Sequence, residues 1–177
     1  MNIGFVSSPE RGETDRLLAE AAEQLLREGV QLAGIVKHMD HVARAENGCD
    51  MQVRVLPAGP IIQITQNLGQ GSNACRLDPG ALVEAVTRVE AGDLQEASLF
   101  ILNKFGPEEA TGRGFVSAIG RAIESDIPVL VGVGKASLDA FGEFSGGLAQ
   151  ALPADLDKIL DWCRAAVATQ SDQRKRA

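Results

Sequence analysis

The most chemically suggestive residues of this sequence lie near its N-terminus, between a short apolar stretch and a long amphipathic one. The segment from Ser7 to Thr14 has the spacing of a phosphate-binding loop, G-x-x-x-x-G-K-S/T, in which backbone N–H groups and a lysine surround phosphate oxygens. Ser7 stands at the first glycine, Gly12 at the second glycine and Thr14 at the hydroxyl residue. Glu13 stands at the lysine. The sequence therefore predicts a phosphate loop that keeps its shape and inverts its charge.

The charge inversion has a large energetic consequence. Two unit charges about 4 Å apart interact by about 4 kcal/mol at an effective dielectric constant near 20. Exchanging attraction for repulsion beside a triphosphate shifts the binding free energy by several kcal/mol, and each step of about 1.4 kcal/mol is a tenfold change in affinity. We therefore expect ordinary nucleoside triphosphate hydrolysis from this loop to be disfavoured.

A second set of candidate residues follows an apolar strand predicted over 97–102. Glycines let a backbone approach an anion closely, and a helix beginning near residue 114 offers free N–H groups. Ligands of open α/β sheets bind beyond the carboxyl ends of strands, so we expect a phosphate, a nucleotide or a small oxyanion such as molybdate here. The alternative is a glycine-rich connection shaped for tight packing. The predicted binding residues of both loops, with Arg76 converging from a third, are Gly12, Glu13, Thr14, Arg76, Asn103, Lys104, Gly106, Glu109, Gly112 and Arg113.

One specific interaction is predicted between the two loops. If the sheet places the loop after the first strand beside the end of the 97–102 strand, Glu13 and Lys104 pair across the site, or Lys104 supplies the missing positive charge. The alternative is two unrelated surface charges. A separation of their charged ends beyond about 10 Å, one Debye length, would exclude the pairing.

Two further candidates involve histidine and cysteine. His38, Asp40, His41 and Cys49 form an H-x-x-H pattern with a nearby thiol, a set that could bind a transition metal. The spacing is not a recognised ligand pattern, so a solvated loop is the favoured interpretation and no metal site is predicted. Cys75 could be a reactive thiol, because the adjacent Arg76 would lower its pKa, but a buried structural cysteine is the favoured interpretation.

Two motifs carry a family resemblance. The first is QNLGQGSNACRLDPGAL at 66–82, and the second is NKFG at 103–106 followed by Glu109, Gly112, Arg113 and Gly114. Together they resemble an uncharacterised bacterial domain family of unknown function, whose genes often lie beside molybdate-transport genes. The resemblance covers nearly the whole chain. It implies a link to molybdate metabolism and supplies no mechanism.

More remotely, the order of elements is similar to that of the small nucleoside-triphosphatases of the cancer-related type. In those proteins a strand ends in an acidic pair, followed by a glycine and a further acidic residue. Asn103 and Lys104 stand at the pair here, Gly106 at the glycine, and Glu108 or Glu109 near the further acid. Magnesium binding and water activation need carboxylates at such positions. The resemblance therefore implies a phosphate-loop fold that has lost both the loop cation and the acidic pair.

Short apolar runs alternate with helical patterns along the chain, which predicts an α/β fold with three layers and a mainly parallel sheet. The expected strands are 2–6, 32–36, 97–102 and 128–133, with a β-hairpin inserted over 51–56 and 61–65. The expected helices are 14–28, 79–89, 115–124 and 154–167. We expect one P-loop-like domain over 1–169 and a polar flexible tail over 170–177.

Composition narrows the class of protein. The 177 residues are 45% hydrophobic and 23% charged, as in a globular domain. A net charge of −7 argues against nucleic acid as a partner. No apolar run approaches the ~20 residues of a membrane span, so no membrane partner is expected. Three cysteines without a signal peptide predict free thiols and a cytoplasmic location. The oligomeric state stays open.

These observations favour a nucleotide- or oxyanion-binding protein with a degenerate phosphate loop, non-hydrolytic, with a small anion as its partner and no assignable cofactor. Two alternatives stay open. The first is an active nucleoside triphosphatase in which Lys104 or Arg113 replaces the loop lysine and Glu108 or Glu109 holds magnesium. The second is an interaction protein whose ancestral pocket is filled.

Overall fold

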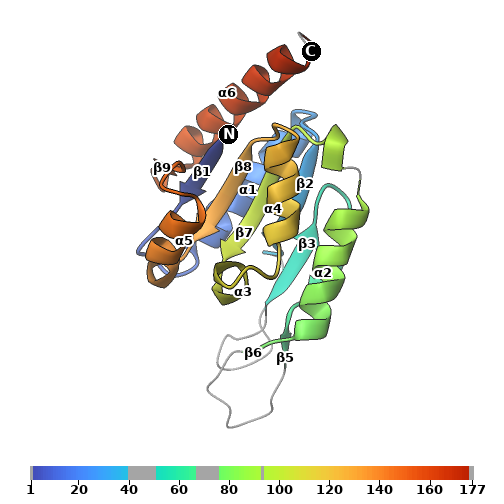
Figure 1. Ribbon diagram of the computed structural model, residues 1–177, viewed down its shortest axis with the longest axis vertical. Coiled ribbons are helices and arrows are strands. Elements are labelled where there is room, and N and C mark those ends of the chain that lie inside the picture. The colour runs from blue at the N-terminus through green and yellow to red at the C-terminus, as the bar shows by residue number, and fades with distance from the viewer. Residues whose placement is uncertain (1, 40–50, 67–75, 93, 176–177) are drawn as a thin grey trace.

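The computed structural model describes residues 2–39, 51–66, 76–92 and 94–175, with only the backbone of residue 76 (Figure 1). These residues form a seven-stranded sheet in the order β4-β3-β2-β7-β8-β1-β9 and a separate two-stranded sheet of β5 and β6. The strands are β1 (Ile3–Val6), β2 (Leu32–Lys37), β3 (Gln52–Val55), β4 (Ile61–Gln63), β5 (Thr65–Gln66), β6 (Arg76–Leu77), β7 (Leu99–Phe105), β8 (Val129–Val133) and β9 (Gln150–Leu152). The helices are α1 (Glu13–Arg27), α2 (Pro79–Ala91), α3 (Pro107–Ala110), α4 (Val116–Glu124), α5 (Leu138–Phe144) and α6 (Leu156–Arg174). Two short 3₁₀ turns, η1 (Leu94–Glu96) and η2 (Lys135–Ser137), complete the described elements.

The centre of the sheet is parallel, because β2, β7, β8, β1 and β9 pair in parallel along their shared order. Every residue of β8 is buried, and β7 is buried except at Lys104. Near-continuous apolar runs of this kind are typical of parallel strands covered on both faces. The strands β3 and β4 form the predicted antiparallel hairpin beside β2. The prediction of a mainly parallel sheet with an inserted hairpin is confirmed.

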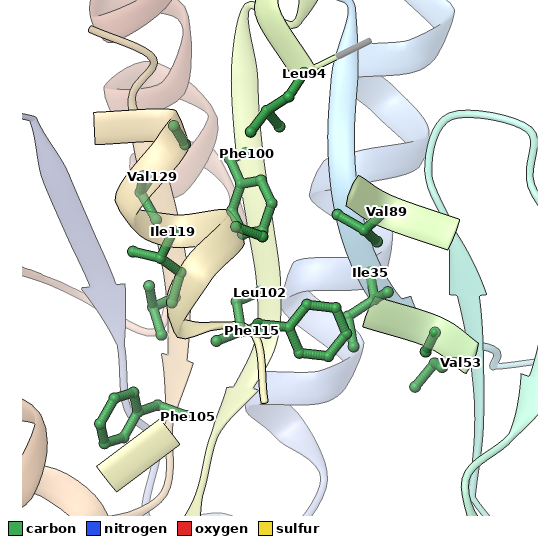
Figure 2. Close-up of a cluster of buried hydrophobic side chains, with 14 of the residues drawn as sticks. Ile35, Val53, Val89, Leu94, Phe100, Leu102, Phe105, Phe115, Ile119 and Val129 are labelled. Carbon is green, nitrogen blue, oxygen red and sulfur yellow. The ribbon is translucent and has the colours of Figure 1, made fainter. Parts of the chain in front are cut away.

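Helices cover both faces of the sheet and create two hydrophobic cores. Successive side chains of a strand point to opposite faces, so Ile101 of β7 packs with α1 and α6 while Phe100 and Leu102 pack with α2 and α4. Figure 2 shows the second core, where Phe100, Leu102 and Phe115 lie between the sheet and the helices. Three layers result, as the sequence predicts.

Local signals set the ends of the helices. The backbone at Gly12, immediately before α1, has a φ of 80°, which an L side chain rarely adopts. Asp78 caps α2 and accepts hydrogen bonds from the N–H groups of Gly80 at 2.9 Å and Ala81 at 3.1 Å. Pro79 at the first helical position lacks the N–H that would otherwise need a partner. The predicted start of α2 is confirmed.

Two predicted boundaries are corrected. The strand predicted over 97–102 extends as β7 to Phe105, so Asn103 and Lys104 are strand residues rather than loop residues. The helix predicted over 154–167 runs as α6 to Arg174, through most of the segment expected to be a polar tail. Gln170 is buried, and the Arg174 guanidinium donates to the carbonyl of Gln95 at 2.7 Å. These contacts hold the polar end of the helix against the body of the protein.

Candidate functional site

The carboxyl ends of the parallel strands bring the candidate residues to one edge of the sheet (Figure 1). The loop 7–12 follows β1, Lys37 ends β2, Asn103 lies near the end of β7, and Gly134 follows β8. Because these strands are parallel, their carboxyl ends face the same side, where ligands of open α/β sheets bind. The edge is the candidate site.

The loop after β1 is held by its own side chains. The N–H of Ser8 donates to Oγ1 of Thr14 at 3.1 Å, and the N–H of Glu10 donates to Oγ of Ser8 at 3.1 Å. The Ser8 hydroxyl donates to the Glu13 carboxylate, which also lies 3.8 Å from the Arg16 guanidinium. A carboxylate in the first turn of a helix interacts favourably with the helix dipole. Glu13 thus stabilises the loop at the place where an active phosphate loop carries lysine.

The first turn of α1 still presents backbone donors. Within the described part of the chain, the N–H groups of Gly12, Thr14 and Asp15 make no hydrogen bond, whereas that of Arg16 donates to the Gly12 carbonyl at 3.0 Å. Free N–H groups at a helix N-terminus are the donors that a phosphate loop aims at an anion. The backbone part of the predicted site is therefore in place.

A partly buried polar network lies beside this turn, and two of its three members, Asp15 and Lys37, were missed at the level of sequence. Asp15 receives a bond from the Lys37 ammonium at 3.1 Å and another from the Asn103 amide at 3.1 Å. Asn103 is 2% exposed, and its amide oxygen accepts from the backbone N–H of Lys37 at 2.9 Å. Asp15 reads as an ordinary first-turn acid, and Lys37 as a charge that ends an apolar strand. Only the strand order brings them together.

The ion pair predicted between Glu13 and Lys104 is not formed, so that prediction is wrong. Glu13 bonds to Ser8, and the cation that approaches the first turn of α1 is Lys37. The Asn103 amide turns toward α1, where it bonds to Asp15. The pairing of β7 with β8 is irregular between Leu102 and Phe105, so the alternation of side chains along the strand is interrupted at Lys104. Lys104 is exposed, and its Cε lies 3.6 Å from the position that a Cβ would occupy at Gly134.

The second predicted loop uses its acid for structure. Glu109 is 5% exposed, and its carboxylate accepts from the N–H of Gly106 at 3.0 Å and from the N–H of Phe115 at 3.1 Å. Gly114, with a φ of 58°, leaves room for this carboxylate, since a Cβ there would collide with it. Both oxygens of Glu109 are engaged by backbone donors, which makes it a poor candidate for magnesium.

Arg113 is also engaged, although on the surface. Its Nε lies 2.8 Å from Oε2 of Glu108. The hydrogen bond between them lowers the pKa of the Glu108 carboxyl and raises the pKa of the Arg113 guanidinium. Gly112 shapes the turn that precedes Arg113. The positive charge expected to attract a ligand is thus paired with a neighbouring acid.

The remaining candidates fall partly outside the described residues. Asp40, His41, Cys49 and Cys75 lie outside them, and only the backbone of Arg76, paired with Gln66, is described. Across the described ranges, no group of three or more His, Cys, Asp or Glu side chains is arranged to hold a metal ion. His38 lies at the carboxyl edge directly after β2, and its backbone N–H donates to the Gln52 carbonyl at 2.8 Å.

Other features lie away from the edge. A hollow of about 250 Å³ sits at the opposite end of the sheet, between the end of α4 and α6, and is lined by residues such as Asp126, Thr169 and Gln173. Burial raises the pKa of the Cys163 thiol to about 12, which leaves this thiol unreactive at neutral pH. Of the helices in the described ranges, none is long and apolar enough to cross a membrane.

Comparison with known families identifies the chain at the family level. Residues 3–162 match the model of a family described as proteins of unknown function (DUF2478), and the chain belongs to this family. It is also 36% identical over 154 residues to the molybdenum import ATP-binding protein ModC 2 of Bradyrhizobium diazoefficiens. That match covers 86% of this chain and only 17% of the relative's length.

Two solved structures share the fold. The solution structure of a human cancer-related nucleoside triphosphatase superposes with a TM-score of 0.59 at 16% identity, covering 96% of this chain and 97% of that chain. The crystal structure of THEP1 from the hyperthermophile Aquifex aeolicus also gives 0.59, at 14% identity, covering 91% and 95%. The predicted P-loop-like α/β fold and the predicted resemblance are confirmed.

Proposed function

We propose that this member of the DUF2478 family binds a small anionic ligand, a nucleotide or an oxyanion, at the carboxyl edge of its sheet and does not hydrolyse it. One observation carries the proposal: the first turn of α1 keeps its unpartnered N–H groups, while both nearby acids, Glu13 and Asp15, are held by hydrogen bonds. The backbone donors favour an anion. Glu13, which replaces the loop cation, disfavours phosphoryl transfer.

The engaged side chains of the second loop support the non-hydrolytic part. An active enzyme would need a relocated lysine and a carboxylate for magnesium. Arg113 is paired with Glu108, and Glu109 is bonded to backbone N–H groups. Lys104 is an exposed cation near the end of β7 and makes no ion pair with the residues that the structure describes. We propose that Lys104 supplies the positive charge that the loop lacks.

The relative narrows the choice of ligand. Its printed name joins molybdenum import to ATP binding, so molybdate and adenine nucleotides are the first ligands to test on this chain. The matching segment is only 17% of that relative, so a link to molybdate handling is part of the proposal. The cytoplasmic location predicted from the sequence belongs to the same proposal.

A thermal-shift panel tests the proposal directly. The wild-type chain is melted with ATP, GTP, ADP, phosphate, molybdate and tungstate, each with and without Mg²⁺. A ligand at about 100 times its Kd stabilises by about 2.7 kcal/mol, which for a chain of this size raises Tm by roughly 5–10 °C. We expect such a shift for at least one anion, together with no phosphate release from ATP or GTP above the buffer rate.

A matched pair of variants locates the ligand. Lys104→Gln removes the exposed cation at the site, and Lys158→Gln removes an equally exposed lysine on α6. The first variant is expected to weaken binding about tenfold, the usual scale of one lost charge contact, and the second to leave binding unchanged. Equal behaviour of the two variants contradicts the role of Lys104, and phosphate release lost in Lys104→Gln would establish the enzyme instead.

The network of Asp15, Lys37 and Asn103 favours one second candidate, an interaction protein whose ancestral pocket is filled by its own side chains. A melting temperature that stays constant across the whole panel supports this candidate and overturns the proposed function.

A further inference from the structure

Three elements converge on the carboxylate of Asp15. Its Oδ2 receives a bond from Nζ of Lys37, at the end of β2, and its Oδ1 receives one from Nδ2 of Asn103 in β7, each at 3.1 Å. The amide of Asn103 cannot turn over freely, because its oxygen accepts from the backbone N–H of Lys37 at 2.9 Å. The backbone of Lys37 therefore fixes the orientation of the amide, and its N–H₂ group would keep this direction if the Asp15 carboxylate moved away.

This donor arrangement suits a larger anion than a carboxylate. An ammonium group and a fixed amide N–H point at two oxygens of one anionic group, beside the unpartnered N–H groups of Thr14 and Asp15. Charge-assisted donors and free helix N–H groups are the ordinary means of binding phosphate-like oxyanions. Asp15 thus presents its two oxygens where a tetrahedral oxyanion would present two of its own.

The exposure of the three side chains would allow an external anion to replace the Asp15 carboxylate. Asn103 is 2% exposed and lies beneath the ion pair, whereas the side chain of Asp15 is 20% exposed and that of Lys37 is 30% exposed. Solvent therefore reaches the ion pair, and the exchange requires the Asp15 side chain to turn outward into it. An incoming anion would meet both donors at their present positions.

We propose that Lys37 and Asn103 form an oxyanion subsite that the chain's own Asp15 occupies in the unliganded protein. The ligand class, a phosphate-like or molybdate-like oxyanion, rests on the proposed function. Asp15 acts as an internal competitor: the apparent affinity falls by the fraction of molecules in which the subsite is free. Lys37 supplies a cation to this subsite, in addition to the positive charge that we propose for Lys104.

Removing the competitor tests this proposal. Binding of molybdate, inorganic phosphate and ATP is measured by calorimetry for the wild type and for Asp15→Ala. If Asp15 holds the subsite in nine of ten molecules, Asp15→Ala binds about tenfold more tightly. The double variant Asp15→Ala/Lys37→Met is expected to lose this gain. Asp15→Ala binding no more tightly than the wild type, or an equal gain in the double variant, overturns the proposal.

A surface ion pair provides the control. Glu28→Ala frees Arg164 from a comparable tertiary pair, in which Nη2 of Arg164 lies 2.7 Å from Oε1 of Glu28. Glu28→Ala is expected to give less than a twofold gain in affinity, because Arg164 lies on α6 away from the first turn of α1, and the amide that also bonds to Glu28, that of Gln24, is exposed. A gain equal to that of Asp15→Ala would show that any freed cation produces the effect, and would also overturn the proposal.

The arms of the experiment separate the possible sources of the oxyanion and guard against misfolding. A gain for molybdate and phosphate alone identifies a free oxyanion, whereas a gain for ATP alone identifies the phosphate chain of a nucleotide. Asp15→Asn keeps the shape of the side chain without its charge, so it is expected to fold and to gain part of the affinity. If Asp15→Ala melts early, phosphate is expected to restore its Tm more than it raises that of the wild type, and equal shifts in the two count against the subsite.

The result also separates this inference from the proposed function. A wild type that binds none of the anions, together with Asp15→Ala that binds them, overturns the proposed function and leaves the self-occupied subsite standing. If the wild type binds an anion and Asp15→Ala binds it no more tightly, the proposed function stands and the self-occupied subsite is overturned.

Discussion

The loop after β1 and the loop after β7 look alike in sequence and differ in what their polar groups do. Both combine glycine, a threonine and charges of both signs next to a helix N-terminus, with one glycine in the first loop and several in the second. In the first, backbone N–H groups of α1 stay unpartnered among the described residues. In the second, the Glu109 carboxylate takes the N–H groups of Gly106 and Phe115, and Glu108 pairs with Arg113.

The difference shows what decides whether the backbone N–H groups of such a loop are satisfied within the protein or stay available to a ligand. A carboxylate that is buried beneath a loop satisfies the loop's donors from inside, whereas a carboxylate bonded to a side chain leaves the backbone donors free. Burial of the acid, rather than its presence, separates the two cases: Glu109 is buried, and Glu13 is only partly so. The first loop is therefore the better candidate for a ligand.

The largest expected effect comes from restoring the lysine of the first loop. Glu13→Lys exchanges repulsion for attraction beside bound phosphates, and we expect ATP to bind more tightly by about 3 kcal/mol, or about a hundredfold. Calorimetry with MgATP measures the gain. Phosphate release is expected to stay at the buffer rate, because neither Asn103 nor Lys104 offers a carboxylate for magnesium. No gain in affinity would show that the loop has lost its phosphate-binding shape.

Removing the buried carboxylate of Glu109 tests its structural role in the loop after β7. Glu109→Ala leaves the N–H groups of Gly106 and Phe115 without partners, and each buried unsatisfied group costs about 1–3 kcal/mol. We expect a loss of about 2–3 kcal/mol in the free energy of unfolding, measured in urea. Glu108→Ala, one residue earlier and paired on the surface, serves as the control and is expected to change the free energy of unfolding far less. Equal losses of unfolding free energy in Glu109→Ala and Glu108→Ala would show that the buried carboxylate stabilises the loop no more than the surface one.

Alanine at the left-handed glycines compares the two loops more finely. Gly114→Ala meets both an unfavourable φ and the Glu109 carboxylate, and we expect it to cost about 2 kcal/mol or more. Gly12→Ala meets an unfavourable φ alone, with no atom within 4 Å of the new Cβ, and we expect about 1 kcal/mol. Urea unfolding of both variants gives the two values, and a larger loss at Gly12 would reverse the interpretation.

The smallest effect concerns the surface pair of Glu108 and Arg113. Because the pKa of Glu108 is lowered in the folded protein, its stabilising contribution is present above the ordinary pKa of a glutamate and is lost as the pH falls through the lowered value. The stability difference between the wild type and Glu108→Gln should therefore be small at neutral pH and vanish in acid. Added salt should shrink it at neutral pH, since the pair is exposed. An NMR titration of the Glu108 carboxyl checks the direction of the pKa shift.

Much of the fold could be predicted from local patterns. The buried strands, the hairpin around residues 57–60 and the cap at Asp78 are each encoded within a few neighbouring residues. The position of the phosphate-like loop follows in the same way from one strand, one glycine and one helix start. Boundaries that depend on distant contacts were less predictable: α6 continues to Arg174 because that side chain reaches the carbonyl of Gln95.

The sequence by itself determined the alternation of strands and helices and the acidic residue at the head of α1, because periodicity, capping and loop spacing act between near neighbours. Tertiary structure alone decided which charges meet. Asp15 lies 22 residues from Lys37 and 88 residues from Asn103, and the order of β2, β7, β8 and β1 in the sheet brings the three together. No local pattern carries that order, since it arises from how the helices bury both faces of the sheet.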